Sequence, residues 1–164
     1  MTGNPWLEDG GRWLGLHAAG GDREYAWDWY PDTLLGAQFI GHTMSPQFQE
    51  AEILVADKSA LTGHLPTPWV VGPEEWYAFD RNPRAQGAKI LLVLDESSYK
   101  PENAGFMPFP DTSMPGEHPI AWTQQIGRGA MTYSAIGHRP ETYALPAYRE
   151  FITRAIRQLL EHTP

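Results

Sequence analysis

The chain has 164 residues, 41% of them hydrophobic and 20% charged, a composition typical of one globular domain with its own core. Its 20 acidic residues outnumber the 12 lysines and arginines and give a formal net charge of −8, so binding to the phosphate backbone of nucleic acids is excluded. The longest continuously apolar run, residues 90–94, is far too short to cross a membrane.

Cysteine is absent, which excludes disulfide bonds, thiolate metal sites and cysteine nucleophiles. The first ten residues contain Glu8 and Asp9 and no basic segment, unlike a secretory signal peptide. We therefore expect a cytoplasmic protein, with one domain over residues 1–164, that binds neither nucleic acid nor membranes.

Aromatic side chains are numerous, with seven Trp, seven Tyr and six Phe. At this density they usually fill the core, but flat aromatic faces also line sugar-binding clefts, where they stack on pyranose rings. Composition alone leaves both interpretations open.

The first half of the chain alternates short predicted strands with turns. Residues 12–17 predict a buried strand that ends at a glycine-containing turn, and residues 27–35 place apolar side chains at helical spacing. Residues 49–56 alternate apolar and polar side chains, as a strand does. Two further strands are expected at 69–71 and 74–79.

The second half holds the clearest elements. Residues 89–94 are continuously apolar after the first, as in a strand covered on both faces. Residues 97–118 form a long proline-containing loop, and long loops are often functional. Residues 120–126 and 130–136 predict a β-hairpin, and a helix begins near Pro146 with apolar side chains at helical spacing.

Polar side chains follow the ends of these strands. His17, Asp95 and Glu96 come directly after apolar strands, and His138 follows the second strand of the hairpin. In α/β sheets, ligands bind beyond the carboxyl ends of the strands. We therefore expect a site at one edge of the sheet, where parallel strands bring His17 and His138 together.

Seven short segments, read in chain order, carry a resemblance to a known family. They are GRWLGLHAA at 11–19, LGAQFIGH at 35–42, EEWYAF at 74–79, LVLDESSY at 92–99, HPIAW at 118–122, GRG at 127–129 and IGHRPETY at 136–143. These segments resemble, in the same order, motifs of the ThuA-like (trehalose utilisation) family. Each motif is weak alone, but the likeness covers residues 11 to about 160 in register.

The resemblance implies an α/β fold of the flavodoxin-like, three-layer type, in the class I glutamine amidotransferase-like superfamily. In the related amidotransferases a cysteine nucleophile occupies a tight strand-to-helix turn, and here that place is held by His17. Because the chain has no cysteine, it is not a glutamine amidotransferase. Family members are associated with the use of trehalose and related disaccharides.

Two departures from the family pattern affect the expectation. The family's His-Pro after the second motif appears here as His42 and Thr43. Family domains also begin with a strand, a helix and another strand before the first motif, so the resemblance implies that about the amino-terminal third of the usual domain is missing. The strand at 12–17 would then expose an apolar edge, and we expect a homo-oligomer or a partner chain.

The candidate catalytic residues are His17, Glu75 and His138. An imidazole and a carboxyl group are the usual pair for moving protons near pH 7, and the aromatic surroundings of Glu75 favour a raised pKa. The alternatives are that each histidine simply bonds to nearby backbone, and that Glu75 forms a salt bridge to Arg81 or Arg84.

The candidate substrate-binding residues are His42, Trp76, Tyr77, Asp95 and Glu96. Trp76 and Tyr77 could supply a flat surface for a sugar ring, although one of the two must face the core. Asp95 and Glu96 could instead cap the loop that they begin. Histidines together with carboxylates could also bind a divalent metal such as zinc, but no HxH or HExxH spacing is present, so the cofactor stays unknown.

The sequence therefore predicts a carbohydrate-processing protein that acts on trehalose-type disaccharides or their keto derivatives by His/Glu acid–base chemistry, as a hydrolase or a lyase. Two alternatives stay open: a non-catalytic subunit that binds or senses sugar, and a partial domain that a partner chain completes. The residues 101–115 are expected at the rim of the pocket.

Overall fold

The computed structural model of the chain describes residues 3–103 and 110–161. The strands are β1 (Arg12–Leu16), β2 (Phe39–His42), β3 (Phe48–Val55), β4 (Trp69–Glu75), β5 (Tyr77–Phe79), β6 (Lys89–Leu94), β7 (His118–Ile126) and β8 (Gly129–Ser134). The α-helices are α1 (Pro5–Glu8) and α2 (Pro146–Glu161). Short helical turns are η1 (His17–Gly20), η2 (Tyr30–Leu35), η3 (Pro83–Gln86), η4 (Glu96–Ser98) and η5 (Pro140–Ala144).

Six strands form a curled sheet in the order β1-β8-β7-β6-β3-β4, and β2 pairs with β5 in a separate two-stranded sheet. Only β1 and β8 run parallel; every other pairing in the two sheets is antiparallel. β1 and β4 are the two edges of the large sheet. The edge position of β1 agrees with the sequence analysis, whereas the expected oligomer stays a prediction.

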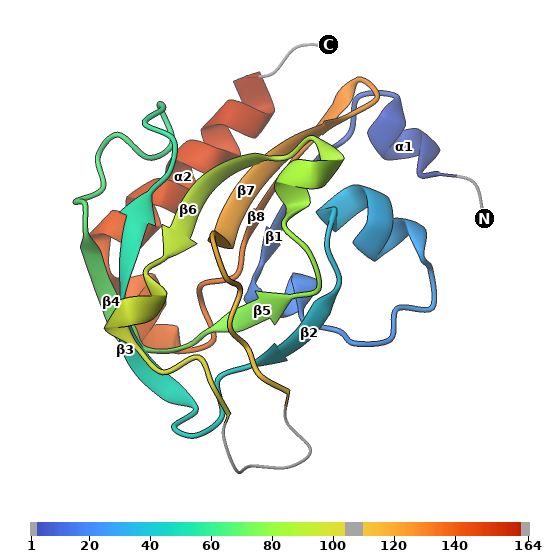
Figure 1. Cartoon of the computed structure of the whole chain (residues 1–164). Coiled ribbons are helices and arrows are strands. Elements are labelled where there is room, and N and C mark those ends of the chain that lie inside the picture. Colours follow the sequence, from blue (N-terminus) through green and yellow to red (C-terminus); the bar gives the residue numbers. More distant parts are fainter. Residues whose placement is uncertain (1–2, 104–109, 162–164) are drawn as a thin grey trace.

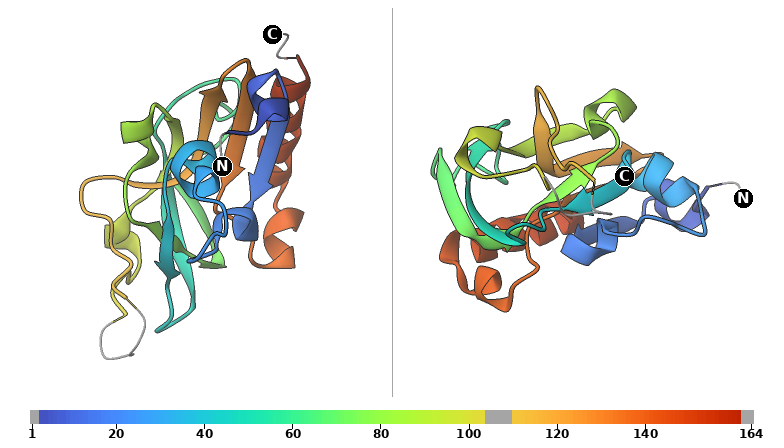
Figure 2. Two further views of the ribbon diagram at one scale, coloured as in Figure 1. Left: turned by 90° about the vertical axis from the view of Figure 1, so that its right-hand side faces the viewer. Right: turned by 60° about the horizontal axis from the view of Figure 1, so that its bottom comes forward.

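The layers follow from the distribution of apolar side chains. α2 buries Tyr148, Phe151, Ala155 and Leu159, which recur on one helical face, and it packs against β1 and β8. In Figures 1 and 2, α2 covers one side of the large sheet, and η2 with the β2–β5 sheet covers the other. Three layers result, with the core between them.

Two predicted elements differ from the structure in an informative way. The strands expected at 69–71 and 74–79 are one strand, β4, followed by a break at Trp76 and then by β5. At the break, Trp76 turns into the core and its indole N–H donates to the carbonyl oxygen of Gln49 at 2.9 Å. The helical stretch expected at 27–35 is reduced to η2, which ends where Gly36 adopts a left-handed φ of 76°.

The hairpin and the final helix are confirmed. β7 and β8 pair through the turn at Gly127 and Arg128, with Ile126 opposite Gly129. β6 is almost wholly buried, as its apolar run predicted. Among the described residues, no helix is long and apolar enough to span a membrane.

Candidate functional site

His17 and His138 meet because β1 and β8 are parallel and in register, with Leu16 opposite Ser134. His17 directly follows β1, and its Nδ1 lies 2.8 Å from the carbonyl oxygen of Ala135, just past β8. Its Nε2 lies 3.2 Å from Nδ1 of His138. The prediction that both histidines lie at the same edge of the sheet is confirmed.

The backbone at His17 is unusual. Among the described residues it is the only non-glycine residue with a positive φ, 42°. This conformation is costly for an L-residue, so neighbouring groups must hold it. Tyr133 donates its hydroxyl to the carbonyl oxygen of His17 at 2.8 Å, and Gly20 allows that ring to approach, since a Cβ there would lie 2.5 Å from Cζ of Tyr133.

Glu75 completes the group from β4. Its Oε2 lies 3.4 Å from Nε2 of His17 and 3.2 Å from Nδ1 of His138. Its Oε1 accepts a hydrogen bond from Nε2 of Gln47 at 2.6 Å and lies 3.3 Å from Nδ1 of His42. Only 3% of Glu75 is exposed. β1 and β4 are opposite edges of the sheet, so the curl of the sheet brings its two edges together at this carboxylate.

The expectation of a raised pKa for Glu75 is wrong. Burial by itself raises the pKa, but the close side chains of His17 and Gln47, with the nearby His42 and His138, lower it to about 2. Glu75 is therefore an ionised carboxylate at neutral pH. The alternative of a salt bridge to arginine is also wrong, because Arg81 pairs with Asp32 and Asp80, and Arg84 pairs with Glu117.

Tyr77 and His42 form the walls beside this group. Glu75 and Tyr77 are two positions apart, so both face the same side while Trp76 faces the other. The ring of Tyr77 lies 4.1 Å from that of His17, and burial with the nearby Glu75 carboxylate raises the pKa of its hydroxyl above the ordinary value. Nδ1 of His42 donates to the carbonyl oxygen of Thr43 at 2.8 Å.

These side chains line a pocket of about 740 Å³. The predicted residues found in it are His17, His42, Glu75, Tyr77 and His138. Residues that sequence reasoning did not single out also line it, namely Ala18, Gly21, Asp22, Arg23, Glu24, Phe39 and Gln47. The lining of the pocket therefore combines charged and polar side chains with the aromatic side chains of Phe39 and Tyr77.

The structure does not bring three predicted residues into this pocket. Trp76 is 1% exposed and lies in the core, so the expectation that it contacts a sugar is corrected. Asp95 accepts hydrogen bonds from the backbone amide and the hydroxyl of Ser97 and caps the start of η4, as the capping alternative predicted. These bonds lower the pKa of Asp95.

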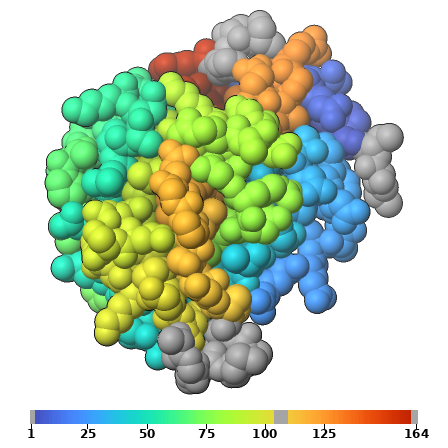
Figure 3. Space-filling view, in the orientation of Figure 1, coloured from blue at the N-terminus to red at the C-terminus, as the bar shows by residue number. Residues whose placement is uncertain are grey.

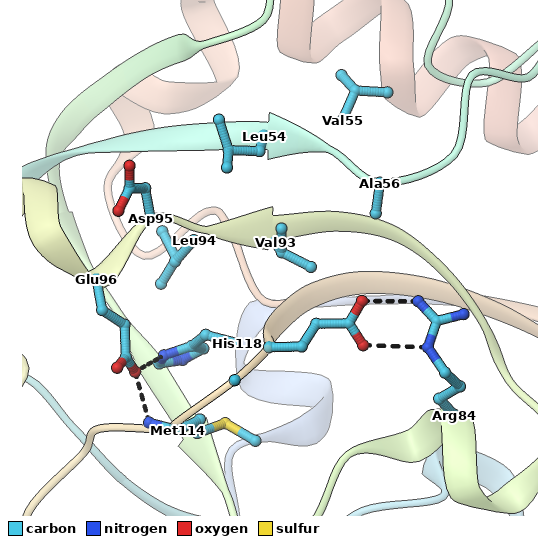
Figure 4. A pocket seen from close by; sticks show the side chains of 12 residues that line it. Leu54, Val55, Ala56, Arg84, Val93, Leu94, Asp95, Glu96, Met114 and His118 are labelled. Carbon is cyan, nitrogen blue, oxygen red and sulfur yellow. Dashed lines mark hydrogen bonds and ion pairs between the residues drawn. The ribbon is translucent and has the colours of Figure 1, made fainter.

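Asp95 and Glu96 instead line a second pocket of about 590 Å³ (Figure 4). There Glu96 lies 2.7 Å from Nδ1 of His118, and Arg84 pairs with Glu117 at 2.7 Å. In Figure 3 the segment before β7 crosses this face of the molecule between the segment around η4 and the segment around η3. Binding of substrate by Asp95 and Glu96 stays a prediction, at a place separate from His17.

The loop expected at the rim lies partly outside the described residues, which omit 104–109. Its described part contacts the backbone near His42: Asn103 accepts a hydrogen bond from the amide of Met44 at 2.8 Å and donates to the carbonyl oxygen of His42 at 3.1 Å. None of its described residues lines the 740 Å³ pocket.

Glu74 is the main residue that sequence reasoning missed. It is fully buried, and its carboxylate accepts from the backbone amides of Gly137, at 3.2 Å, and His138, at 3.1 Å. It also accepts from the hydroxyl of Thr142 at 2.6 Å and from the amide of Glu75 at 2.9 Å. Glu74 thus fixes the main chain that carries His138.

The fold defines a class: a three-layer α/β domain of the class I glutamine amidotransferase-like type, in which His17 begins the turn that follows β1. The chain belongs to the ThuA family, described as trehalose utilisation, which matches residues 4–158. No curated protein matches it closely enough to count as a relative.

Solved structures support the fold. A ThuA-like protein from Bacteroides uniformis is 26% identical with a TM-score of 0.74, over 94% of this chain and 60% of that one. This chain thus spans 60% of that protein's length. A cytoplasmic protein from Salmonella typhimurium is 11% identical with a TM-score of 0.57, over 94% of this chain and 57% of that one. A β-galactosidase from Rahnella is 15% identical with a TM-score of 0.51, over 94% of this chain and 20% of that one. These two proteins are similar to this chain in fold alone. The expected flavodoxin-like, amidotransferase-like fold is confirmed.

Proposed function

We propose that this chain is a carbohydrate-processing enzyme that acts on trehalose-type disaccharides or their keto derivatives, with His17, Glu75 and His138 as its catalytic group. The observation that carries the proposal is the meeting of these three side chains, from three separate segments, within 3.2–3.4 Å of one another at one pocket. Membership of a family described as trehalose utilisation supports the substrate class.

The pocket suits a disaccharide. Its volume of about 740 Å³ falls within the range of small-molecule sites, about 300–1,000 Å³. Among its lining residues, Asp22, Arg23 and Glu24 offer hydrogen-bond partners for sugar hydroxyls, and Tyr77 and Phe39 offer apolar surface.

The hydrogen bonds of His17 define how it handles protons. A carbonyl oxygen can only accept, so Nδ1 of His17 carries the hydrogen that Ala135 accepts, and Nε2 of the neutral ring is left with a lone pair. Nε2 is thus a proton acceptor at the pocket. The Glu75 carboxylate beside it stabilises the imidazolium that forms, and His138, whose side chain is 38% exposed, is the group best placed to exchange protons with a bound sugar.

The test is turnover. We expect the purified chain to convert trehalose, or its keto derivative, to products visible by NMR. His17→Ala and His138→Ala should each lower kcat by about 100-fold or more, the usual size of an acid–base contribution. His64→Ala is the control, since His64 bonds to the carbonyl oxygen of Ala147 in the first turn of α2 and does not line the pocket.

Full activity in both variants would overturn the catalytic assignment. Binding of sugar without any turnover, measured by calorimetry, would replace the enzyme with the second candidate, a sugar-binding subunit. That candidate has the same pocket in its favour and needs no proton transfer.

A further inference from the structure

We propose that Nε2 of His17, Oε2 of Glu75 and Nδ1 of His138 are the ligands of one divalent cation of the zinc type. This inference rests on the proposed function and deepens it, because it names what the catalytic group holds; with the ion bound, the lone pair of His17 Nε2 would serve as a ligand in place of accepting a proton. Its test needs no sugar, so it succeeds or fails independently of turnover.

The spacing of the three atoms fits such an ion. The distances are 3.4 Å from His17 to Glu75, 3.2 Å from Glu75 to His138 and 3.2 Å from His138 to His17. For zinc bonded to nitrogen or oxygen at about 2.0–2.1 Å, tetrahedral geometry puts neighbouring ligand atoms about 3.3–3.4 Å apart. The three atoms therefore form a triangle close to one face of a zinc tetrahedron.

The hydrogen-bond inventory of the group is incomplete without a cation. Nε2 of His17 presents a lone pair, because Nδ1 donates to Ala135. Oε2 of the ionised Glu75 is also an acceptor. His138 can offer a single hydrogen at Nδ1, yet this atom faces both acceptors at 3.2 Å. One hydrogen cannot point at both acceptors, and with the hydrogen of His138 on Nε2 the three atoms present three converging lone pairs, the arrangement that a metal ion needs.

The surrounding bonds orient these ligands as in known metal sites, where outer partners fix the tautomer and the direction of each ligand. Ala135 fixes the tautomer of His17. Gln47 occupies the other oxygen of Glu75 and leaves Oε2 for the ion. Glu74 holds the amide of His138.

The donor set and its setting select the type of ion. Two imidazole nitrogens and one carboxylate oxygen favour zinc or a similar transition metal over Mg²⁺ or Ca²⁺, which prefer oxygen ligands. All three residues line the 740 Å³ pocket. Catalytic zinc sites have three protein ligands and an open position for water or substrate, and here that position faces the pocket.

The other buried histidine–carboxylate pair does not share these features. In the part of the chain that the structure describes, His17, Glu75 and His138 are the one group of three or more potential ligands close enough to share an ion. His118 and Glu96 are two, and the second nitrogen of His118 faces a carbonyl oxygen. They serve as an internal comparison.

The experiment is metal titration of the full chain. The protein is freed of metal with a chelator and titrated with Zn²⁺ by calorimetry, and with Co²⁺ by visible absorption. We expect one ion per chain and the intense absorption of four-coordinate cobalt. Glu75→Gln, which keeps the shape, and His138→Ala, at a partly exposed side chain, should weaken Zn²⁺ binding by more than about 100-fold, beyond the 10–100-fold typical of outer partners.

Glu96→Gln and His64→Ala are matched controls that should bind Zn²⁺ as the unchanged chain does, and circular dichroism verifies that each variant is folded. The absence of a stoichiometric ion would overturn the proposal, as would equal binding by the folded His138→Ala variant. Zinc bound without sugar turnover would defeat only the proposed function, whereas undiminished turnover by the metal-free chain would defeat only the metal site.

Discussion

Two buried histidine–carboxylate groups in this molecule differ in how their hydrogen bonds are completed. At His118, Nδ1 faces Glu96 at 2.7 Å and Nε2 faces the carbonyl oxygen of Tyr77 at 2.8 Å. Each ring nitrogen of His118 thus has its own close acceptor. At His17, in contrast, Nδ1 has one acceptor, the carbonyl oxygen of Ala135, whereas Nε2 faces two groups at once, Oε2 of Glu75 at 3.4 Å and Nδ1 of His138 at 3.2 Å.

The difference separates a structural group from a chemical one. Each ring nitrogen of His118 has a hydrogen-bond partner, so this group holds β7 against β5 and has no ring nitrogen left to bind a ligand. The group at His17 leaves acceptor atoms facing one another at the pocket. Buried polar groups in proteins are normally satisfied, and a group that is not points to a proton, an ion or a ligand that completes it.

The largest loss of stability is expected when Glu74, which holds the backbone of the His138 group, is replaced. We expect Glu74→Ala to lower the free energy of unfolding by about 3 kcal/mol or more, because it leaves the buried donors of Gly137, His138 and Thr142 without an acceptor. Urea unfolding measures the loss. Glu50→Ala, at an exposed position on β3, is the control and should change stability by less than about 0.5 kcal/mol. Equal stability of the two variants would show that Glu74 does not anchor the His138 segment.

A smaller effect is expected at Gly137. This glycine has a φ of 119°, and a Cβ there would collide with the hydroxyl of Tyr143. Gly87 is the matched control, since it has a φ of 91° and nothing within 4 Å of a Cβ. We expect Gly137→Ala to lower the free energy of unfolding by about 2–3 kcal/mol and Gly87→Ala by about 1 kcal/mol. Both substitutions put a side chain on a backbone with positive φ, but only the first also displaces a neighbouring ring.

Unfolding of both variants by urea gives the two values. Their difference reports how tightly the turn before His138 is packed. Equal losses would mean that Tyr143 yields easily and that the turn is not held by packing.

The smallest expected change in stability concerns the pair of His118 and Glu96. The hydrogen bond from His118 lowers the pKa of Glu96 below its ordinary value, against the opposing effect of burial. A carboxylate with a lowered pKa stabilises the fold at pH values above its unfolded pKa, and the contribution disappears as the pH falls through its folded pKa. The advantage of the unchanged chain over Glu96→Gln should therefore be present at pH 6 and vanish in acid.

Because Glu96 is partly exposed, we expect that advantage to stay under about 1 kcal/mol. Thermal unfolding across pH measures it. An advantage that persists unchanged below the folded pKa of Glu96 would contradict the ion pair.

The sequence predicted the part of the site that depends on strand ends. His17 and His138 each follow a strand, and the parallel pairing of β1 with β8 was enough to bring them together. The position of Glu75 came from the family resemblance, since no periodicity shows that opposite edges of a sheet will meet. The alternation at Glu75, Trp76 and Tyr77 was visible, but which aromatic side chain faced the core depended on the break after β4.

Other features depended on contacts that no local pattern contains. Glu74 and His138 are 64 positions apart, so no local pattern indicates that this glutamate is buried and anchors the His138 segment. The lowered pKa of Glu75 has the same origin, because its partners come from three other segments. Asp95, in contrast, bonds to Ser97 only two positions away, so its role as a cap could be predicted from local sequence.

The curl of the large sheet has a consequence for how the molecule responds to occupancy. β1 and β4 are not paired with each other in the sheet. The side chain of Glu75, at the end of β4, contacts the side chain of His17, directly after β1. A ligand or ion bound there would connect two edge strands that no backbone hydrogen bonds join. Its binding free energy would be felt by every strand between the two edges, as added resistance of the entire domain to opening, and not as a local stiffening of one loop.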